Sequence, residues 1–174
     1  MKQTIMVLGV VLILFYGVTI LLTSTTVRST NSPNRSAQQA ADITVPRVPL
    51  EFLATAKAMN NPVAPTPENL ARGKRVFTST GACYTCHGVE GKGDGPAGVG
   101  LFPPPRDFTD TRFHELRTDG ELFWVVRYGS PGSSMFAYAP QIITEEDAWH
   151  VVGYLQTLSD PARRPQADAP STPS

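Results

Sequence analysis

The stretch GACYTCHGVEGKGDGP, residues 81–96, contains both cysteines of the 174-residue chain. Two residues separate Cys83 from Cys86, and His87 follows the second cysteine directly. Four kinds of chemistry use cysteines at this close spacing: a metal clip, a redox-active dithiol, a disulfide and a thioether attachment site for haem. The rest of the sequence must decide among these four.

The surroundings favour haem attachment over the other three. A structural zinc site needs four ligands, and the three scattered histidines of this chain provide no second pair at a useful spacing. A thioredoxin-like dithiol belongs to a βαβ pattern, which is absent here. A disulfide between Cys83 and Cys86 would close a very short loop and leave His87 unexplained. The signature C-x-x-C-H of c-type haem explains all three residues, with two thioethers and one histidine ligand to iron.

Three segments carry the signals of α-helices, and little in the sequence indicates strands. Thr66, Pro67 and Glu68 supply a cap, a first-turn proline and an acidic residue, which predicts a helix to about Thr78. A second helix is expected from the Thr118–Asp119 cap to Gly129. The sequence therefore predicts an all-α fold.

A third helix is expected to begin at Thr144, because the acidic residues 145–147 suit the first turn of a helix. Its apolar residues recur every three or four positions, as on a buried helix face: Ala148, Val151, Val152, Leu155 and Leu158. The loops between the helices are rich in Gly and Pro. Short helices joined by such loops form a poor core unless a large apolar group fills the middle.

Several of these segments together resemble the class I cytochrome c domain. They are GKRVF (73–77), CYTCH (83–87), VVGYL (151–155) and a methionine in a Gly/Pro/Ser loop, and the resemblance covers residues 67–159. It implies an all-α domain wrapped around one covalently bound haem c. It also implies that the first and last helices cross at Gly73, Phe77 and the Val151/Tyr154 pair, and that the domain lies outside the cytoplasm.

Four residues are candidates for the iron ligand opposite His87: Met135, His114, His150 and Met59. The resemblance favours Met135, which lies in the flexible loop between the second and third predicted helices. His150 is expected to form a surface ion pair with Glu146, one helical turn away. We expect His114 to be an exposed loop residue, while Met59 would need the preceding segment to fold back.

The surroundings of the predicted haem give weaker expectations. The second ring nitrogen of His87 should donate to a backbone carbonyl, and Pro96 is the candidate, with the run 103–105 as the alternative. The aromatic residues of the second helix, Phe123, Trp124 and Tyr128, either line the pocket or pack in the core. Arg106 either pairs with a haem propionate or faces solvent.

Outside the predicted domain, the chain is expected to form a membrane anchor, a linker and a disordered tail. Ile5 to Leu22 carry no charge, and a helix of this length spans about 27 Å, close to the ~30 Å hydrocarbon core of a bilayer. We therefore expect a membrane anchor at residues 1–22, the alternative being a cleaved signal peptide. Residues 23–66 form a linker whose Phe52, Leu53 and Met59 dock on its own domain or on a partner. Residues 160–174 form a disordered tail.

Charge argues against a nucleic-acid partner, because the net charge of the whole chain is zero. The predicted domain is acidic, with 8 Lys/Arg and 12 Asp/Glu between Glu68 and Asp160.

Five segments in order give a finer resemblance, to the monohaem cytochrome c subunit of bacterial alternative complex III, a quinol-oxidising membrane complex. They are NPVAPTPENLARGK (61–74), CHGVEGKGDGP (86–96), PPPRDFTD (103–110), DGELFWVVRYGSPGSSMFAY (119–138) and EEDAWHVVGYL (145–155). The resemblance implies an electron carrier without a catalytic site of its own. Its partners would be a multihaem cytochrome subunit and a terminal oxidase or soluble acceptor.

The orientation implied is a single span with a cytoplasmic N-terminus and the cytochrome domain on the extracytoplasmic face of the cell membrane. The alternatives are the haem c subunit of a nitric oxide reductase and a free-standing anchored shuttle. A sensor or peroxidase with an open iron site, in which Met135 is not bound, is the alternative from a different class.

Overall fold

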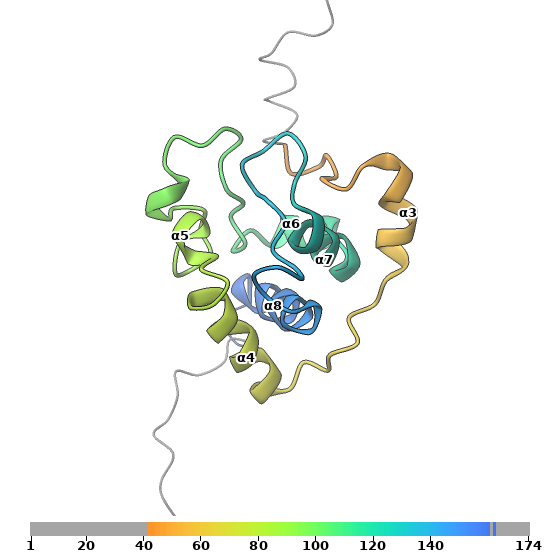
Figure 1. Ribbon diagram of the computed structural model, residues 1–174, viewed down its shortest axis with the longest axis vertical. Coiled ribbons are helices and arrows are strands. Elements are labelled where there is room, and N and C mark those ends of the chain that lie inside the picture. The colour runs from red at the N-terminus through yellow and green to blue at the C-terminus, as the bar shows by residue number, and fades with distance from the viewer. Residues whose placement is uncertain (1–41, 161, 163–174) are drawn as a thin grey trace, which may run out of the picture. The chain divides into compact units, whose positions relative to one another are not determined.

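The computed structural model describes residues 42–160 and 162, which all belong to one folding unit. The described residues form helices and no strands, in agreement with the predicted all-α class (Figure 1). The elements are α3 (Leu50–Ala58), α4 (Pro67–Thr78), α5 (Tyr84–His87), the 3-10 turn η1 (Pro96–Gly98), α6 (Thr111–Leu116), α7 (Asp119–Tyr128) and α8 (Glu145–Leu158).

The predicted membrane span at Ile5–Leu22, the linker up to residue 41 and most of the predicted tail lie outside the described residues. Within residues 42–160, no helix has both the length and the apolar character that a bilayer crossing requires.

The three predicted helices are confirmed, and each begins at the capping residue that the sequence indicates. The Thr66 hydroxyl accepts a hydrogen bond from the Asn69 amide at the start of α4. Thr118 and Glu121 form a reciprocal capping box at the start of α7. Thr144 accepts from the Asp147 amide at the start of α8. These side chains satisfy amides that have no partner within the helix, which fixes where each helix starts.

Besides the single turns α5 and η1, two further helices, α3 and α6, were not predicted. The helix α3 follows Pro49 directly and has no side-chain cap, so it carries no start signal of the kind found at α4. The helix α6 is capped by Asp110, whose carboxylate accepts from the Arg112 amide, but it has only six residues. His114 therefore lies on a short helix, and the expectation of a loop position was wrong.

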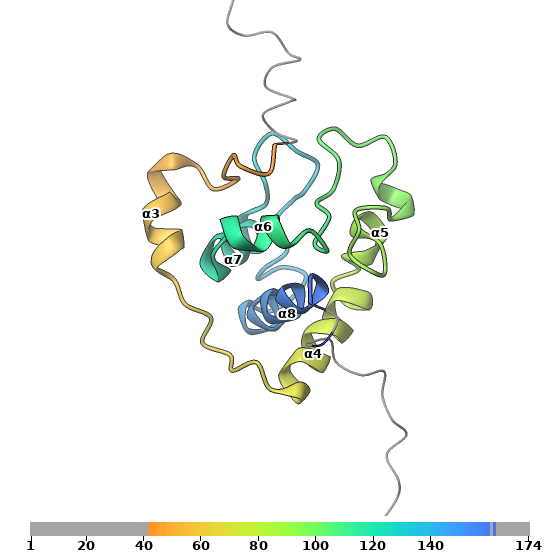
Figure 2. The same cartoon turned by 180° about the vertical axis from the view of Figure 1, so that it is seen from behind.

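The core centres on the crossing of α4 and α8, which pack side by side (Figures 1 and 2). At the crossing a Cβ on Gly73 would overlap the backbone carbonyl oxygen of His150 and lie 2.9 Å from Cβ of Tyr154. The Phe77 and Tyr154 rings meet edge to face, with centroids 5.5 Å apart. Val151 is 2% exposed. The predicted crossing through a glycine and an aromatic pair is therefore confirmed.

Replacing Gly73 by alanine is expected to destabilise the fold by about 1–3 kcal/mol, the usual cost of overpacking a core. The matched control is Gly153→Ala on α8, where a Cβ has ordinary contacts at 3.7 Å with Asn61 and Leu70. That change should leave stability unchanged or raise it by up to about 1 kcal/mol, since alanine suits a helix interior better than glycine. Unfolding in guanidinium chloride measures both. A Gly73→Ala midpoint at or above that of the wild type would contradict the close crossing.

The segment before the domain packs on the domain itself. The helix α3 lies against α7 (Figures 1 and 2), where the Phe52 and Trp124 rings stack with centroids 6.1 Å apart. Val48 and Ala56 are 3% and 0% exposed. The sequence left open whether this segment docks on its own domain or on a partner. The contacts that the structure describes are with its own domain.

Candidate haem-binding site

A cavity lies between α5, α7, α8 and the loops that connect them, and the empty space inside it and at its open mouth together measures about 1050 Å³. Its walls are mainly apolar and include Leu101, Pro103, Phe108, Leu122, Val126 and Leu155. This cavity therefore has room for one large, mostly apolar group.

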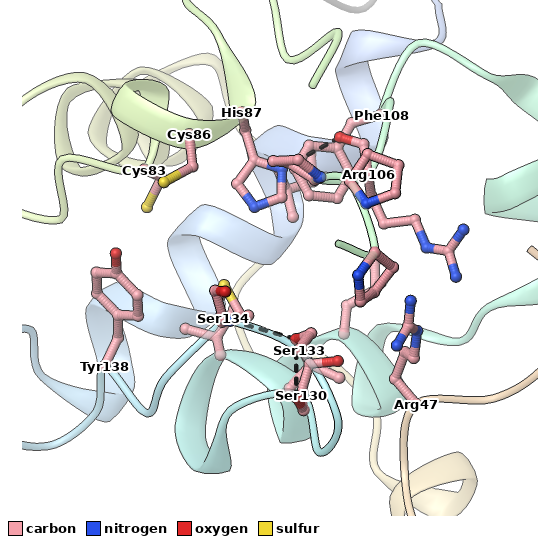
Figure 3. Close-up of a pocket in the computed structure, with 18 of the residues that line it drawn as sticks. Arg47, Cys83, Cys86, His87, Arg106, Phe108, Ser130, Ser133, Ser134 and Tyr138 are labelled. Carbon is pink, nitrogen blue, oxygen red and sulfur yellow. Dashed lines mark hydrogen bonds between the residues drawn. The ribbon is translucent and has the colours of Figure 1, made fainter. Parts of the chain in front are cut away.

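The two cysteine side chains enter the cavity from α5, next to His87 (Figure 3). Both are free thiols, and the Cys83 thiol donates a weak hydrogen bond to the Gly81 carbonyl at 3.6 Å. Burial raises the pKa of Cys83 to about 11. Redox-active dithiols instead have a lowered thiol pKa, so the environment of Cys83 does not favour a dithiol site.

The His87 ring is held by two contacts and is 9% exposed. Its Nδ1 lies 3.1 Å from the carbonyl oxygen of Arg106, and the ring stacks on Phe108 with centroids 4.6 Å apart. A carbonyl can only accept, so Nδ1 carries the hydrogen and Nε2 keeps its lone pair. Burial lowers the pKa of His87, while the bond to Arg106 opposes that shift. The ring is therefore neutral, the form that binds a metal.

The expectation that Pro96 supplies this carbonyl was wrong, and the named alternative, residues 103–105, ends one residue short of Arg106. The glycine-rich loop is instead wrapped on the backbone of α5. The Gly93 amide donates to the His87 carbonyl at 2.7 Å and the Gly95 amide to the Cys86 carbonyl at 3.1 Å. Pro96 then opens η1. The backbone at Arg106, rather than at Pro96, therefore lies beside the His87 ring.

Met135 also lines the cavity, from the loop between α7 and α8. The Ser130 amide donates to the Met135 carbonyl at 2.8 Å, and the Met135 amide donates to the Ser133 hydroxyl at 3.2 Å. These bonds close the loop into a turn. Among the described residues, the cavity lining includes none of the other three candidate ligands, His114, His150 and Met59.

The two other histidines have structural partners. His150 is 4% exposed at the α4–α8 crossing, where Nδ1 lies 3.2 Å from the Asn69 carbonyl oxygen. Its Nε2 is 3.6 Å from Glu146. The predicted partner of His150 is correct, but the predicted surface position was wrong. His114 is half-buried, with Nε2 2.8 Å from the Phe108 carbonyl oxygen.

The sequence left open whether the aromatic residues of α7 line the cavity or pack elsewhere, and the structure places them outside the cavity lining. Leu122, Val125 and Val126 line the cavity, and none of the three aromatic residues of this helix does. Phe123 instead stacks on Trp149, with centroids 3.9 Å apart. Phe123 thus packs in the core and Trp124 against α3, while Tyr128 is 53% exposed. Tyr138, which sequence reasoning missed, does line the cavity, and burial raises its pKa to about 12.

Three arginines, Arg47, Arg106 and Arg117, also line the cavity. Burial is the main cause that lowers the pKa of each, and it lowers that of Arg106 to about 10. The pKa of about 10 for Arg106 also reflects the neighbouring Arg47 and Arg117 charges, which lower it, and Asp42, which opposes the shift. Haem c is an apolar macrocycle with two carboxylates. It matches this apolar cavity, which contains two thiols, one neutral imidazole, the methionine sulfur and a cluster of cations.

The family model described as Cytochrome c matches residues 70–159, more than half of the chain, and the protein therefore belongs to the cytochrome c family. Membership implies covalently bound haem c and electron transfer. The match begins within α4 and ends just after α8, so it leaves Arg47 and α3 outside.

One similar solved structure is a chain of the reducing HAO-like protein complex of Kuenenia stuttgartiensis. The two are 27% identical with a TM-score of 0.51, over 56% of this chain. The match spans 46% of that chain, less than half of its length. Among curated proteins, no match is found.

Proposed function

We propose that the protein is a membrane-anchored one-electron carrier with a single haem c. Cys83 and Cys86 would form the two thioethers, and His87 and Met135 would bind the iron. The observation that carries the proposal is that all four side chains line one apolar cavity. The bound group would supply a one-electron couple, and the protein sets its potential through the axial ligands.

The chemistry of the ligand set favours transfer over catalysis. If His87 and Met135 both bind the iron, no position would remain for oxygen, peroxide or nitric oxide. A thioether ligand also raises the reduction potential relative to other axial groups. These properties suit a carrier that accepts and passes on one electron at a time.

Exposed apolar residues at the rim of the cavity support a route for electron exchange with a partner. Phe136 lines the cavity and is 57% exposed. Val99 and Phe102, close in sequence to the lining residue Leu101, are 80% and 60% exposed. The cavity wall thus reaches the surface among apolar side chains. A partner that docks on these apolar side chains would approach the haem closely.

A potentiometric titration of the purified haem-loaded protein tests the carrier function. We expect one wave with the slope of a one-electron couple, and no reaction of the reduced protein with carbon monoxide. Rapid carbon monoxide binding or peroxide turnover by the wild type would contradict the proposal and favour the sensor or peroxidase alternative.

For the cellular role we propose a subunit of a quinol-oxidising complex of the alternative complex III type. The support is the ordered set of segments 61–74, 86–96, 103–110, 119–138 and 145–155. That the similar Kuenenia chain belongs to a protein complex agrees with a subunit role. The electron donor would be a multihaem cytochrome subunit and the acceptor a terminal oxidase or soluble carrier.

Membrane attachment and partners can be tested together by purifying a C-terminally tagged chain from detergent-solubilised membranes of its source cell. We expect a multihaem cytochrome to co-purify, and deletion of residues 1–22 behind a cleavable export signal to release the cytochrome domain from the membrane. Co-purification with a nitric oxide reductase core, or with nothing, would favour one of the two alternatives instead.

A further inference from the structure

The segment that precedes the cytochrome c family match is fastened across the haem cavity. Two of the cavity arginines bind its backbone: Arg106 Nη2 donates to the Asp42 carbonyl at 3.0 Å, and Arg117 Nη2 donates to the Ile43 carbonyl at 2.6 Å. Farther along, the Asn61 side chain donates to the Trp149 carbonyl on α8 at 3.1 Å. We call residues 42–61 the strap.

The middle of the strap packs as closely as the core does. A Cβ on Gly120, in the first turn of α7, would overlap the Ala56 carbonyl oxygen and lie 2.7 Å from the Met59 carbonyl oxygen. Ala56 is 0% exposed. Only a residue without a side chain permits this approach, so the contact between α3 and α7 is a built feature of the fold rather than a loose association.

The start of the strap contributes directly to the cavity wall. Val48 is 3% exposed, and Val48 and Arg47 both line the cavity. Figure 3 shows the guanidinium groups of Arg47 and Arg106 on the same side of the cavity. Among the described residues, no acceptor meets the buried Nε of Arg47. Burying a charged donor without an acceptor is costly, so an anionic group is expected there.

We propose that the strap is part of the haem pocket and that Arg47 supplies a cation to a haem carboxylate. The inference rests on the proposed function and extends it to a residue outside the family match. Of the haem's own groups, the two carboxylates are the anionic ones, and guanidinium groups bind carboxylates with paired hydrogen bonds. Arg47 is thus a positioning residue for the cofactor.

A cation in this position has a consequence for the reduction potential. Reduction adds one negative charge to the iron centre, and a nearby positive charge in a partly dry pocket stabilises the reduced form. Removing the charge of Arg47 should therefore lower the potential. The effect should exceed that of any exposed charge, because solvent screens exposed charges.

The test compares reduction potentials of Arg47→Gln, Arg47→Lys and Lys57→Gln in the full haem-loaded chain. Lys57 lies on the same strap but is exposed and outside the cavity, and its replacement changes the net charge by the same amount. We expect Arg47→Gln to lower the equilibrium constant for reduction about tenfold, or about 59 mV for a one-electron couple. Arg47→Lys should retain most of the wild-type potential, and Lys57→Gln all of it. Equal shifts in Arg47→Gln and Lys57→Gln would overturn the proposal.

A second measurement tests the strap without relying on a potential. Trypsin cleaves after arginine and lysine, and the bond after Arg47 leads into the buried Val48. In the folded wild type, we expect cleavage there to be no faster than cleavage after Arg75 in α4. Fast cleavage after Arg47 with the haem domain intact would show a detached strap. The spectrum of the wild type tests the proposed function separately, so an intact two-ligand spectrum beside a detached strap would refute only this inference.

Discussion

Replacing both Cys83 and Cys86 by alanine is expected to abolish covalent haem attachment. No other cysteine exists in the chain, so no thioether can form elsewhere. Haem staining after denaturing electrophoresis should be lost completely. Each single variant keeps one thiol in the cavity and should retain haem through one bond, with an altered absorption spectrum because one vinyl group stays unreacted.

The single variants serve as the matched controls for the double variant. Each removes one half-buried thiol, Cys83 from the N-cap of α5 or Cys86 from the helix itself. If both single variants stain and the double variant does not, the two sulfurs are the attachment points. Covalent haem in the double variant would contradict the assignment, and so would an unaltered spectrum in either single variant.

Replacing Met135 by alanine is expected to open the iron to external ligands. Met135 provides the only methionine sulfur among the side chains that line the described cavity. No other methionine of that lining can take its place. The reduced variant should bind carbon monoxide within mixing time, whereas the wild type should not. Its reduction potential should fall, because a thioether favours the reduced iron.

The control for this variant is Met59→Ala, in which a second methionine is lost. Met59 packs partly buried against the hydrophobic core and does not line the cavity. We expect Met59→Ala to lose some stability, about 2–5 kcal/mol at most for truncation of a buried methionine, while its iron stays closed to carbon monoxide. A closed iron in Met135→Ala, or an open one in Met59→Ala, would contradict the ligand assignment.

The parts of the fold that could be predicted are those encoded locally. Thr66, Thr118 and Thr144 each accept a hydrogen bond from the helix amide three residues on, and such caps are visible in the sequence. The attachment signature is also local, because Cys83, Cys86 and His87 fall within two turns of chain. The crossing at Gly73 came from resemblance to a family rather than from the spacing of residues.

The parts that were missed depend on contacts between distant segments. The carbonyl beside His87 belongs to Arg106, and no local pattern distinguishes it from that of Pro96. The helix α3 has no cap and is placed by its packing on α7. Arg47 lies in a stretch whose sequence indicates a linker, and only the folded structure places it in the cavity wall. His150 pairs with Glu146 as expected, but its burial follows from the close approach of α4.

The most direct test of the central claim is the optical spectrum of the oxidised wild-type protein, followed by carbon monoxide addition to the reduced form. Ligation by His87 and Met135 predicts a weak sulfur-to-iron charge-transfer band at the red end of the oxidised spectrum. The band should be lost in Met135→His, and the reduced wild type should not respond to carbon monoxide. An oxidised wild type without that band, whose reduced form binds carbon monoxide at once, would contradict the account of a closed one-electron carrier.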